Sequence, residues 1–166
     1  MQTTQSSTLS GIKFIDLFAG IGGFHTALAS FGAECVFASE FEPNASKVYA
    51  FNHGIQPHGD ITLIEPASIP DHDILCGGFP CQPFSIAGNQ KGFEDTRGTL
   101  FFNVAKIIEA KKPKVCILEN VPNILTHDKG NTVTVITNTL KNLGYNVAVS
   151  RSEEHTSELQ SRSAIS

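Results

Sequence analysis

The chain has 166 residues and a formal net charge of −4, from 12 basic and 16 acidic residues. This length suffices for one domain with a buried core, and the acidic balance argues against nucleic-acid binding through overall charge. No apolar run is long enough to cross a bilayer, and the polar N-terminus lacks the features of a signal peptide. We therefore expect a cytoplasmic protein with no membrane association.

Strand-like and helix-like patterns alternate along the chain. Predicted strands cover residues 12–18, 34–39, 73–76 and 114–118, with a further strand beginning at 145, and predicted helices cover residues 24–31, 43–52, 99–110 and 131–143. This alternation predicts an α/β fold with a doubly wound, mostly parallel, Rossmann-like sheet. Residues 1–10 are expected to form a flexible N-terminus before a domain over residues 11–150.

A glycine-rich turn, Gly20-Ile21-Gly22-Gly23, follows the first predicted strand and precedes the first helix. Glycines at such a turn let a ligand approach the backbone closely. Glu40 stands 20 residues after Gly20, at the end of the second predicted strand. Acids at this position hold ribose hydroxyls in Rossmann-like sites. NAD stays an alternative ligand here, although the NAD fingerprint has a third glycine where this chain has His25.

A second group of residues suits an adenine ring. Asp60 can accept a hydrogen bond from an adenine amino group, while Ile61 and Phe18 offer apolar surface to the ring. Plain core packing is the alternative role for Ile61 and Phe18. With Glu40, these residues favour an adenosine-containing cofactor.

Cys81 lies in a stiffened turn, Gly77-Gly78-Phe79-Pro80-Cys81-Gln82-Pro83-Phe84-Ser85, directly after a buried strand pattern. Proline fixes its own φ and restricts the residue before it, so the two prolines hold the thiol in place. Open α/β sheets place their chemistry at the carboxyl ends of strands. The pattern predicts that Cys81 is a nucleophile, with a structural thiol as the alternative.

The other cysteines fit a structural role. Cys35, Cys76 and Cys116 sit in apolar strand patterns, where cysteine behaves as a small buried hydrophobe. In a cytosolic chain all four are expected to be reduced. No cysteine and histidine spacing forms a zinc set, so we assign no metal.

Three features occupy the second half of the chain. Residues 87–98 are polar and glycine-rich and predict a mobile loop. The basic run at 111–114 predicts a solvated turn between helix and strand. Glu119 ends the strand that follows, within Glu119-Asn120-Val121-Pro122. Without further information it is either a catalytic carboxylate or a solvent-facing strand end.

Taken together, these motifs resemble those of the cytosine-C5 DNA methyltransferase family. The resemblance covers residues 11–150 and is greatest to the HhaI-type enzymes of bacterial restriction–modification systems. It is carried, in the family's order, by Asp16-Leu-Phe-Ala-Gly-Ile-Gly-Gly23, Glu40, Gly59-Asp60-Ile61, Gly78-Phe-Pro-Cys-Gln-Pro-Phe-Ser85, Arg97-Gly98-Thr99-Leu100-Phe101 and Glu119-Asn120-Val121.

The resemblance implies S-adenosyl-L-methionine as the cofactor. Its site would be lined by Phe18, Gly20, Gly23, Glu40, Phe41, Asp60, Ile61 and Leu100. The residues implied to contact the substrate base or its DNA are Phe79, Pro80, Ser85 and Arg97.

The resemblance also implies a covalent mechanism. The Cys81 thiolate attacks C6 of a cytosine, which makes C5 nucleophilic enough to accept a methyl group. Glu119 holds the ring at N3 in general-acid fashion. Because the target atom is unreachable inside a duplex, the base must be flipped out of the helix.

The implied partner is double-stranded DNA, with a possible cognate restriction endonuclease that acts on the same site. The full-length protein is expected to be a monomer. Two alternatives remain open: a tRNA cytosine-C5 methyltransferase, and a non-catalytic cofactor-binding module.

The last residues, 151–166, differ in character from the rest of the chain. The string from Arg151 to Ser161 has no strand pattern and resembles the translation of a sequencing adapter, so we expect residues 151–166 to be a non-native tail. A genuine hydrophilic helix is the alternative. The family's target-recognition domain and closing C-terminal segment have no counterpart here. The resemblance therefore implies a truncated catalytic domain, and little activity for these 166 residues alone.

Overall fold

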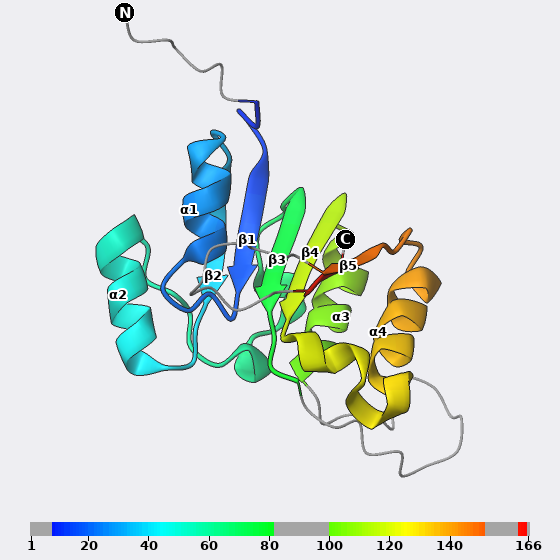
Figure 1. Cartoon of the computed structure of the whole chain (residues 1–166). Helices are drawn as coiled ribbons and strands as arrows, with labels where there is room; N and C mark the ends of the chain where they lie inside the picture. Colours follow the sequence, from blue (N-terminus) through cyan, green and yellow to red (C-terminus); the bar gives the residue numbers. More distant parts are fainter. Residues whose placement is uncertain (1–7, 82–99, 152–162, 166) are drawn as a thin grey trace, which may run out of the picture.

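The computed structural model describes residues 8–81, 100–151 and 163–165 (Figure 1). A six-stranded sheet runs in the order β2-β1-β3-β4-β6-β5. The strands are β1 (Lys13–Leu17), β2 (Glu34–Ser39), β3 (Ile74–Gly78), β4 (Val115–Asn120), β5 (Val149–Arg151) and β6 (Ser163–Ile165). The first four are mutually parallel, whereas β6 pairs antiparallel with both β4 and β5. The predicted doubly wound, mostly parallel α/β fold is confirmed.

Helices cover both faces of this sheet. The α-helices are α1 (Gly23–Ser30), α2 (Pro43–His53), α3 (Leu100–Lys111) and α4 (Asn131–Asn142), and the short 3-10 helices are η1 (Ile61–Leu63), η2 (Pro66–Ser68), η3 (Pro122–Leu125) and η4 (His127–Gly130). In Figure 1, α1 and α2 lie at the β2 side of the sheet, while α3 and α4 lie toward β4.

Successive side chains of β1 point to opposite faces of the sheet and belong to different core clusters. Ile15 and Leu17 belong to the larger core cluster, which also holds the buried side chains of α3. Phe14 belongs to a smaller cluster that includes residues of α1. Strands buried on both faces read as nearly continuous apolar runs, which is why the parallel strands could be located from sequence.

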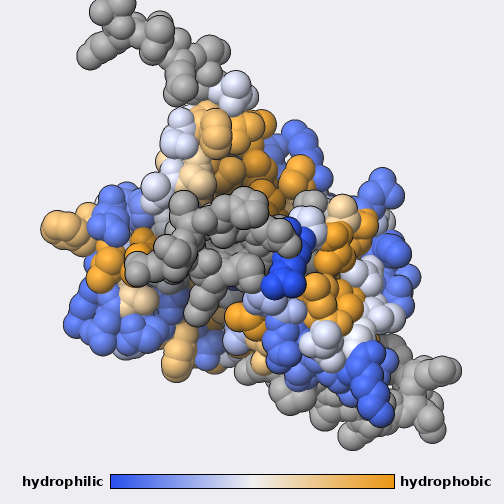
Figure 2. All heavy atoms as spheres, viewed as in Figure 1, coloured by the Kyte–Doolittle hydropathy of each residue, from blue (hydrophilic) through white to orange (hydrophobic). Residues whose placement is uncertain are grey.

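Apolar side chains also reach the surface. On the face shown in Figure 2, hydrophobic areas gather over the region of α1 and β1 and again on the α4 side. Within the described part of the chain, none of the helices is both long and apolar enough to span a membrane.

The helix ends follow the predicted signals. Pro43 occupies the first turn of α2, and the Glu42 carboxylate caps that helix by accepting a hydrogen bond from Ala45 N at 2.6 Å. Gly32 and Gly144 follow α1 and α4 with φ of 90° and 95°. This left-handed conformation favours glycine after a helix.

Two of the three lysines in the basic turn between α3 and β4 form ion pairs. Lys111 Nζ lies 3.2 Å from Asp71 Oδ1, and Lys114 Nζ lies 2.8 Å from Asp73 Oδ1. The Lys114 side chain is 76% exposed. These contacts agree with the prediction of a solvated turn.

The strand predicted to begin at Tyr145 is misplaced. Tyr145 N donates to Leu140 O at 3.1 Å, and the Tyr145 hydroxyl donates to Pro113 O at 2.6 Å. Its backbone therefore closes the end of α4 instead of joining the sheet, and β5 begins at Val149. By contrast, β4 runs two residues beyond its predicted end and includes Glu119 and Asn120.

Part of the tail that is predicted to be non-native forms a strand of the sheet, at residues 163–165. These residues form β6, which pairs Ser163 with Asn120 and Ile165 with Leu118. An unpaired edge of β4 would expose a row of backbone donors and acceptors, and β6 satisfies them. The adapter-like origin of the segment stays a prediction.

The core makes a direct stability prediction. Leu75, in the middle of β3, has no exposed surface. Leu75→Ala is expected to lower the free energy of unfolding by about 2–5 kcal/mol, because it removes buried methyl groups and leaves a cavity. Urea unfolding followed by circular dichroism measures the change. Leu63→Ala is the matched control, because Leu63 is 85% exposed, and it should shift stability by no more than about 0.5 kcal/mol.

Candidate functional site

The predicted site residues gather at one edge of the sheet. Phe18 directly follows β1, Glu40 follows β2, and Cys81 lies three residues past β3. Glu119 is the next-to-last residue of β4. Because these strands are parallel and adjacent, their carboxyl ends meet at the same edge, where open α/β sheets bind ligands.

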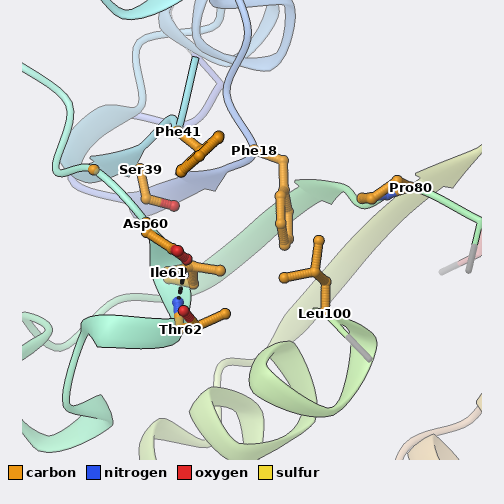
Figure 3. Close-up of a pocket in the computed structure, with 9 residues that line it drawn as sticks. Phe18, Ser39, Phe41, Asp60, Ile61, Thr62, Pro80 and Leu100 are labelled. Atoms are coloured by element: carbon orange, nitrogen blue, oxygen red, sulfur yellow. Dashed lines mark hydrogen bonds between the residues drawn. The ribbon is translucent and has the colours of Figure 1, made fainter. Parts of the chain in front are cut away.

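A cavity of about 340 Å³ opens at this edge (Figure 3). Its lining consists of Phe18, Ser39, Phe41, Gly59, Asp60, Ile61, Thr62, Pro80 and Leu100. Six of these were predicted as cofactor or substrate residues, whereas Ser39, Gly59 and Thr62 were not. Ser39 and Thr62 adjoin predicted residues in sequence, and that adjacency is the one signal that could have identified them.

The cavity combines apolar walls with a fixed acceptor. In Figure 3 the ring of Phe18 extends toward Leu100, with Ile61 on the opposite side. Asp60 caps η1, since its Oδ1 accepts from Thr62 N at 2.8 Å. This bond fixes the carboxylate and leaves Oδ2 without a hydrogen bond to any described residue.

Glu40 connects the end of β2 to the glycine-rich turn. Its Oε2 accepts from Gly20 N at 2.7 Å, and its Oε1 accepts from Glu42 N at 2.8 Å. These two bonds preorient the side chain. Each carboxylate oxygen can accept a further hydrogen bond, so Glu40 can still accept from hydroxyl groups of a ligand. Neither Glu40 nor Gly20 lines the cavity itself. Gly23 does not line it either, and it begins α1.

The turn after β1 is conformationally demanding. Gly22 has φ of 96°, and a Cβ built there would clash with the His53 imidazole. Phe18 also adopts a left-handed φ, 54°, which is costly for a bulky residue. Such strain at a cavity wall is typical of functional sites, because the surrounding structure must hold the residue there.

His25, at the position of the third NAD-fingerprint glycine, lies in a buried aromatic cluster. Its Nδ1 is 2.7 Å from the Tyr49 hydroxyl, and its ring stacks on His53 with centroids 4.0 Å apart. Burial lowers the pKa of His25 to about 4, and the nearby His53 adds to this. The imidazole is therefore neutral near pH 7 and acts as a packing group.

Asp16, in the interior of β1, is fully buried. Neither carboxylate oxygen has a hydrogen-bond partner among the described residues. Burial raises the pKa of Asp16 to about 7; the backbone N–H of His25 opposes this shift, and the charge of Glu40 adds to it. This burial without a partner could not be inferred from the residue pattern, because an acid in an apolar strand is ordinarily paired.

The two predicted catalytic residues lie on adjacent strand ends. Glu119 pairs with Gly78 across the β3–β4 ladder, and a Cβ on Gly78 would come within 3.1 Å of Glu119 Oε2. The glutamate side chain therefore lies over the start of the turn that carries Cys81. Cys81 is half-buried, and burial raises the pKa of its thiol above the ordinary value.

The four residues predicted to contact the substrate differ in exposure, and two of them are not among the described residues. Pro80 is exposed and lines the cavity. The Phe79 side chain is 4% exposed and packs against Phe101, with centroids 5.5 Å apart, so its ring faces the core. Ser85 and Arg97, like the predicted loop over 87–98, lie outside the described residues. Across the described ranges, no group of three histidine, cysteine or acidic side chains could hold a metal ion.

Comparisons with known proteins agree with this geometry. The model of the C-5 cytosine-specific DNA methylase family matches residues 12–152. The chain is 59% identical over 137 residues to the type II methyltransferase M.HhaI of Haemophilus parahaemolyticus, covering 82% of this chain and 42% of that protein. It is 56% identical over 135 residues to M.NgoBI of Neisseria gonorrhoeae, covering 81% and 43%. The chain thus spans less than half the length of these relatives.

Solved structures show the same fold. The S. pombe Dnmt2 methyltransferase superposes with a TM-score of 0.74 at 26% identity, covering 93% of this chain and 50% of that one. A putative DNA modification methyltransferase encoded within an E. coli prophage superposes with a TM-score of 0.69 at 22% identity, covering 93% and 46%. At that identity, the second likeness concerns the fold alone.

Burial of Asp16 makes stability depend on pH. The pKa of Asp16 is about 7 in the folded chain against 3.8 ordinarily, so between these values the folded chain binds more protons than the unfolded one. The free energy of unfolding should therefore fall as pH rises from 4 to 7. Asp16→Asn removes this loss and should gain stability relative to wild type over that range, by up to about 4 kcal/mol. Urea unfolding at several pH values measures the difference, and a difference independent of pH would contradict the expectation.

Proposed function

We propose a function that starts from one established point: the chain belongs to the C-5 cytosine-specific DNA methylase family. The full-length protein transfers a methyl group from S-adenosyl-L-methionine to C5 of a cytosine in double-stranded DNA. It does so as the methyltransferase of a bacterial restriction–modification system, acting as a monomer at a site it shares with a cognate endonuclease. The observation that supports this best is the position of Glu119, which lies at the end of β4 over the start of the turn that carries Cys81 and the cavity-lining Pro80.

The residues present fit the proposed cofactor. A volume of about 340 Å³ lies at the lower end of small-molecule sites. Asp60 offers an acceptor and Ile61 an apolar contact to an adenine, while Phe18 and Leu100 lie across the cavity from Ile61. Glu40 is preoriented beside the glycine-rich turn, where ribose hydroxyls could donate to it. When bound, S-adenosyl-L-methionine supplies an electrophilic methyl group.

The chain's own residues then act on the base. The Cys81 thiolate forms a bond to C6, and the electron pair released toward C5 takes the methyl group. Glu119 holds N3 and neutralises the charge that develops on the ring. Loss of the C5 proton and cleavage of the C6–S bond restore the aromatic ring and the thiolate. Burial raises the pKa of the Cys81 thiol above its ordinary value, so this attack requires a proton acceptor for the thiol.

Two alternatives are distinguishable. A tRNA cytosine-C5 methyltransferase would modify tRNA in preference to duplex DNA when the full-length protein is offered both. Three relatives that are 59%, 56% and 58% identical over the aligned residues are type II methyltransferases, which favours DNA. A non-catalytic cofactor-binding module would bind S-adenosyl-L-methionine but form no covalent adduct with a base.

Cofactor binding can be tested at Asp60. In Asp60→Asn the amide oxygen can still cap η1 by accepting from Thr62 N. The second carboxylate oxygen is replaced by an NH2 group, which is a donor and would face the amino group of the adenine. Affinity for S-adenosyl-L-methionine should fall about tenfold or more, the effect of losing a charged hydrogen bond. Isothermal titration of the full-length protein measures it. Glu65→Gln, at an exposed acid before η2, is the matched control; equal affinities for the two variants would refute this cofactor placement.

The nucleophile can be tested by covalent trapping. Fluorine at C5 prevents loss of the C5 substituent, so the bond between Cys81 and C6 should persist. Full-length protein, S-adenosyl-L-methionine and a long duplex with 5-fluorocytosine throughout one strand should give an adduct that survives denaturing electrophoresis. Cys81→Ala should abolish the adduct. Cys35→Ala, which changes another half-buried cysteine, should retain it. An adduct with the Cys81 variant would overturn the assignment.

A further inference from the structure

Asn120, the last residue of β4, is a polar side chain that the mechanism above does not use. It is 3% exposed and immediately follows Glu119. A buried carboxamide must satisfy both its donor and its acceptor, so its partners reveal what it holds together.

Both halves of the carboxamide are engaged. Asn120 Nδ2 donates to Phe79 O at 2.7 Å, and Asn120 Oδ1 accepts from Val121 N at 2.9 Å. The β3–β4 ladder ends at the pair Gly78 and Glu119. The Asn120 side chain therefore ties the two strands together one residue beyond the point where backbone pairing stops.

This bond reaches the turn that carries the nucleophile. Phe79 is anchored twice, through its ring against Phe101 in the core and through its carbonyl on Asn120. Pro80 has a fixed φ, so little backbone freedom separates the anchored carbonyl from Cys81. On the other strand, Asn120 is bonded directly to Glu119.

We propose that Asn120 is a positioning residue for methyl transfer, whose carboxamide holds the Cys81 turn in register with the Glu119 strand end. The inference rests on the proposed function, because register between these residues matters when one attacks the base and the other holds it. A misplacement of about 1 Å can cost orders of magnitude in rate when two groups act on one substrate.

The test is the reactivity of Cys81 in the 166-residue chain. Asn120→Asp has the same shape and keeps the acceptor for Val121 N, but its carboxylate cannot donate to Phe79 O. The released turn should expose Cys81 and raise its rate of modification about fivefold, the factor given by one ordinary hydrogen bond. The rate is measured with 2,2′-dipyridyl disulfide, which also reacts with thiols in acid, followed by peptide mass mapping.

Acid should reverse the effect. A buried carboxyl facing a carbonyl oxygen has a raised pKa, and once protonated it can donate to Phe79 O again. The ratio of Cys81 rates, N120D to wild type, should therefore fall toward one near pH 5. A ratio near one at every pH would overturn the proposal, and so would a raised ratio that does not change with pH, because a loosened fold does not regain its order on acidification.

Two controls complete the design. Cys76 and Cys116 are buried in the sheet, and their protection in the same digests shows that the fold is intact. If all four cysteines react faster in N120D, the Asn120→Ser variant is compared with wild type at pH 8. In that variant Cys81 alone should gain reactivity, and no gain at Cys81 would overturn the proposal. Asn142→Asp, at an exposed residue ending α4, should change nothing. The assay needs neither DNA nor cofactor, so its outcome is independent of whether methyl transfer is observed.

Discussion

Parallel pairing of β1, β3 and β4 is the constraint on which the site depends. The register pairs Leu17 with Gly77 and Gly78 with Glu119, so the three strands end together. A slip of one residue would move every side chain of a strand to the other face of the sheet. Glu119 would then leave the turn that carries Cys81. The two halves of the proposed chemistry are therefore set by backbone hydrogen bonds before any side chain of the site contributes.

The same edge contains unfavourable features that the core must offset. Phe18 adopts a left-handed backbone conformation, and Asp16 is buried without a hydrogen-bond partner among the described residues. Neighbouring Ile15 and Leu17 are fully buried in the main core cluster, which anchors the strand that leads into the turn. Locally unfavourable residues held by well-packed neighbours are expected at functional sites, where sequence-level rules for stability are broken.

Much of this arrangement was predictable because it depends on local patterns. Apolar runs located the four parallel strands, and Pro43 and Gly144 marked helix ends through their backbone preferences. What depends on contacts distant in sequence was not predictable. Tyr145 was placed in a strand because its bond to Pro113 O cannot be inferred from composition. Asn120 was recognised in a motif, but its bond to Phe79 O links residues 41 positions apart. Burial of Asp16 likewise follows from tertiary packing alone.

The negative charges at the site edge suit the proposed base chemistry but do not suit binding of the DNA phosphates. The site edge carries the carboxylates of Glu40, Asp60 and Glu119, which suit hydroxyl, amino and ring N–H donors but repel phosphate. Lys114 is paired with Asp73 at the start of β4, and is therefore at the opposite edge of the sheet. The whole chain has a net charge of −4, and in the proposed function these three carboxylates serve a cofactor and one base. Under the proposed function, this edge of the sheet therefore serves the cofactor and the base, and binding of the DNA phosphates is a separate task from the base chemistry.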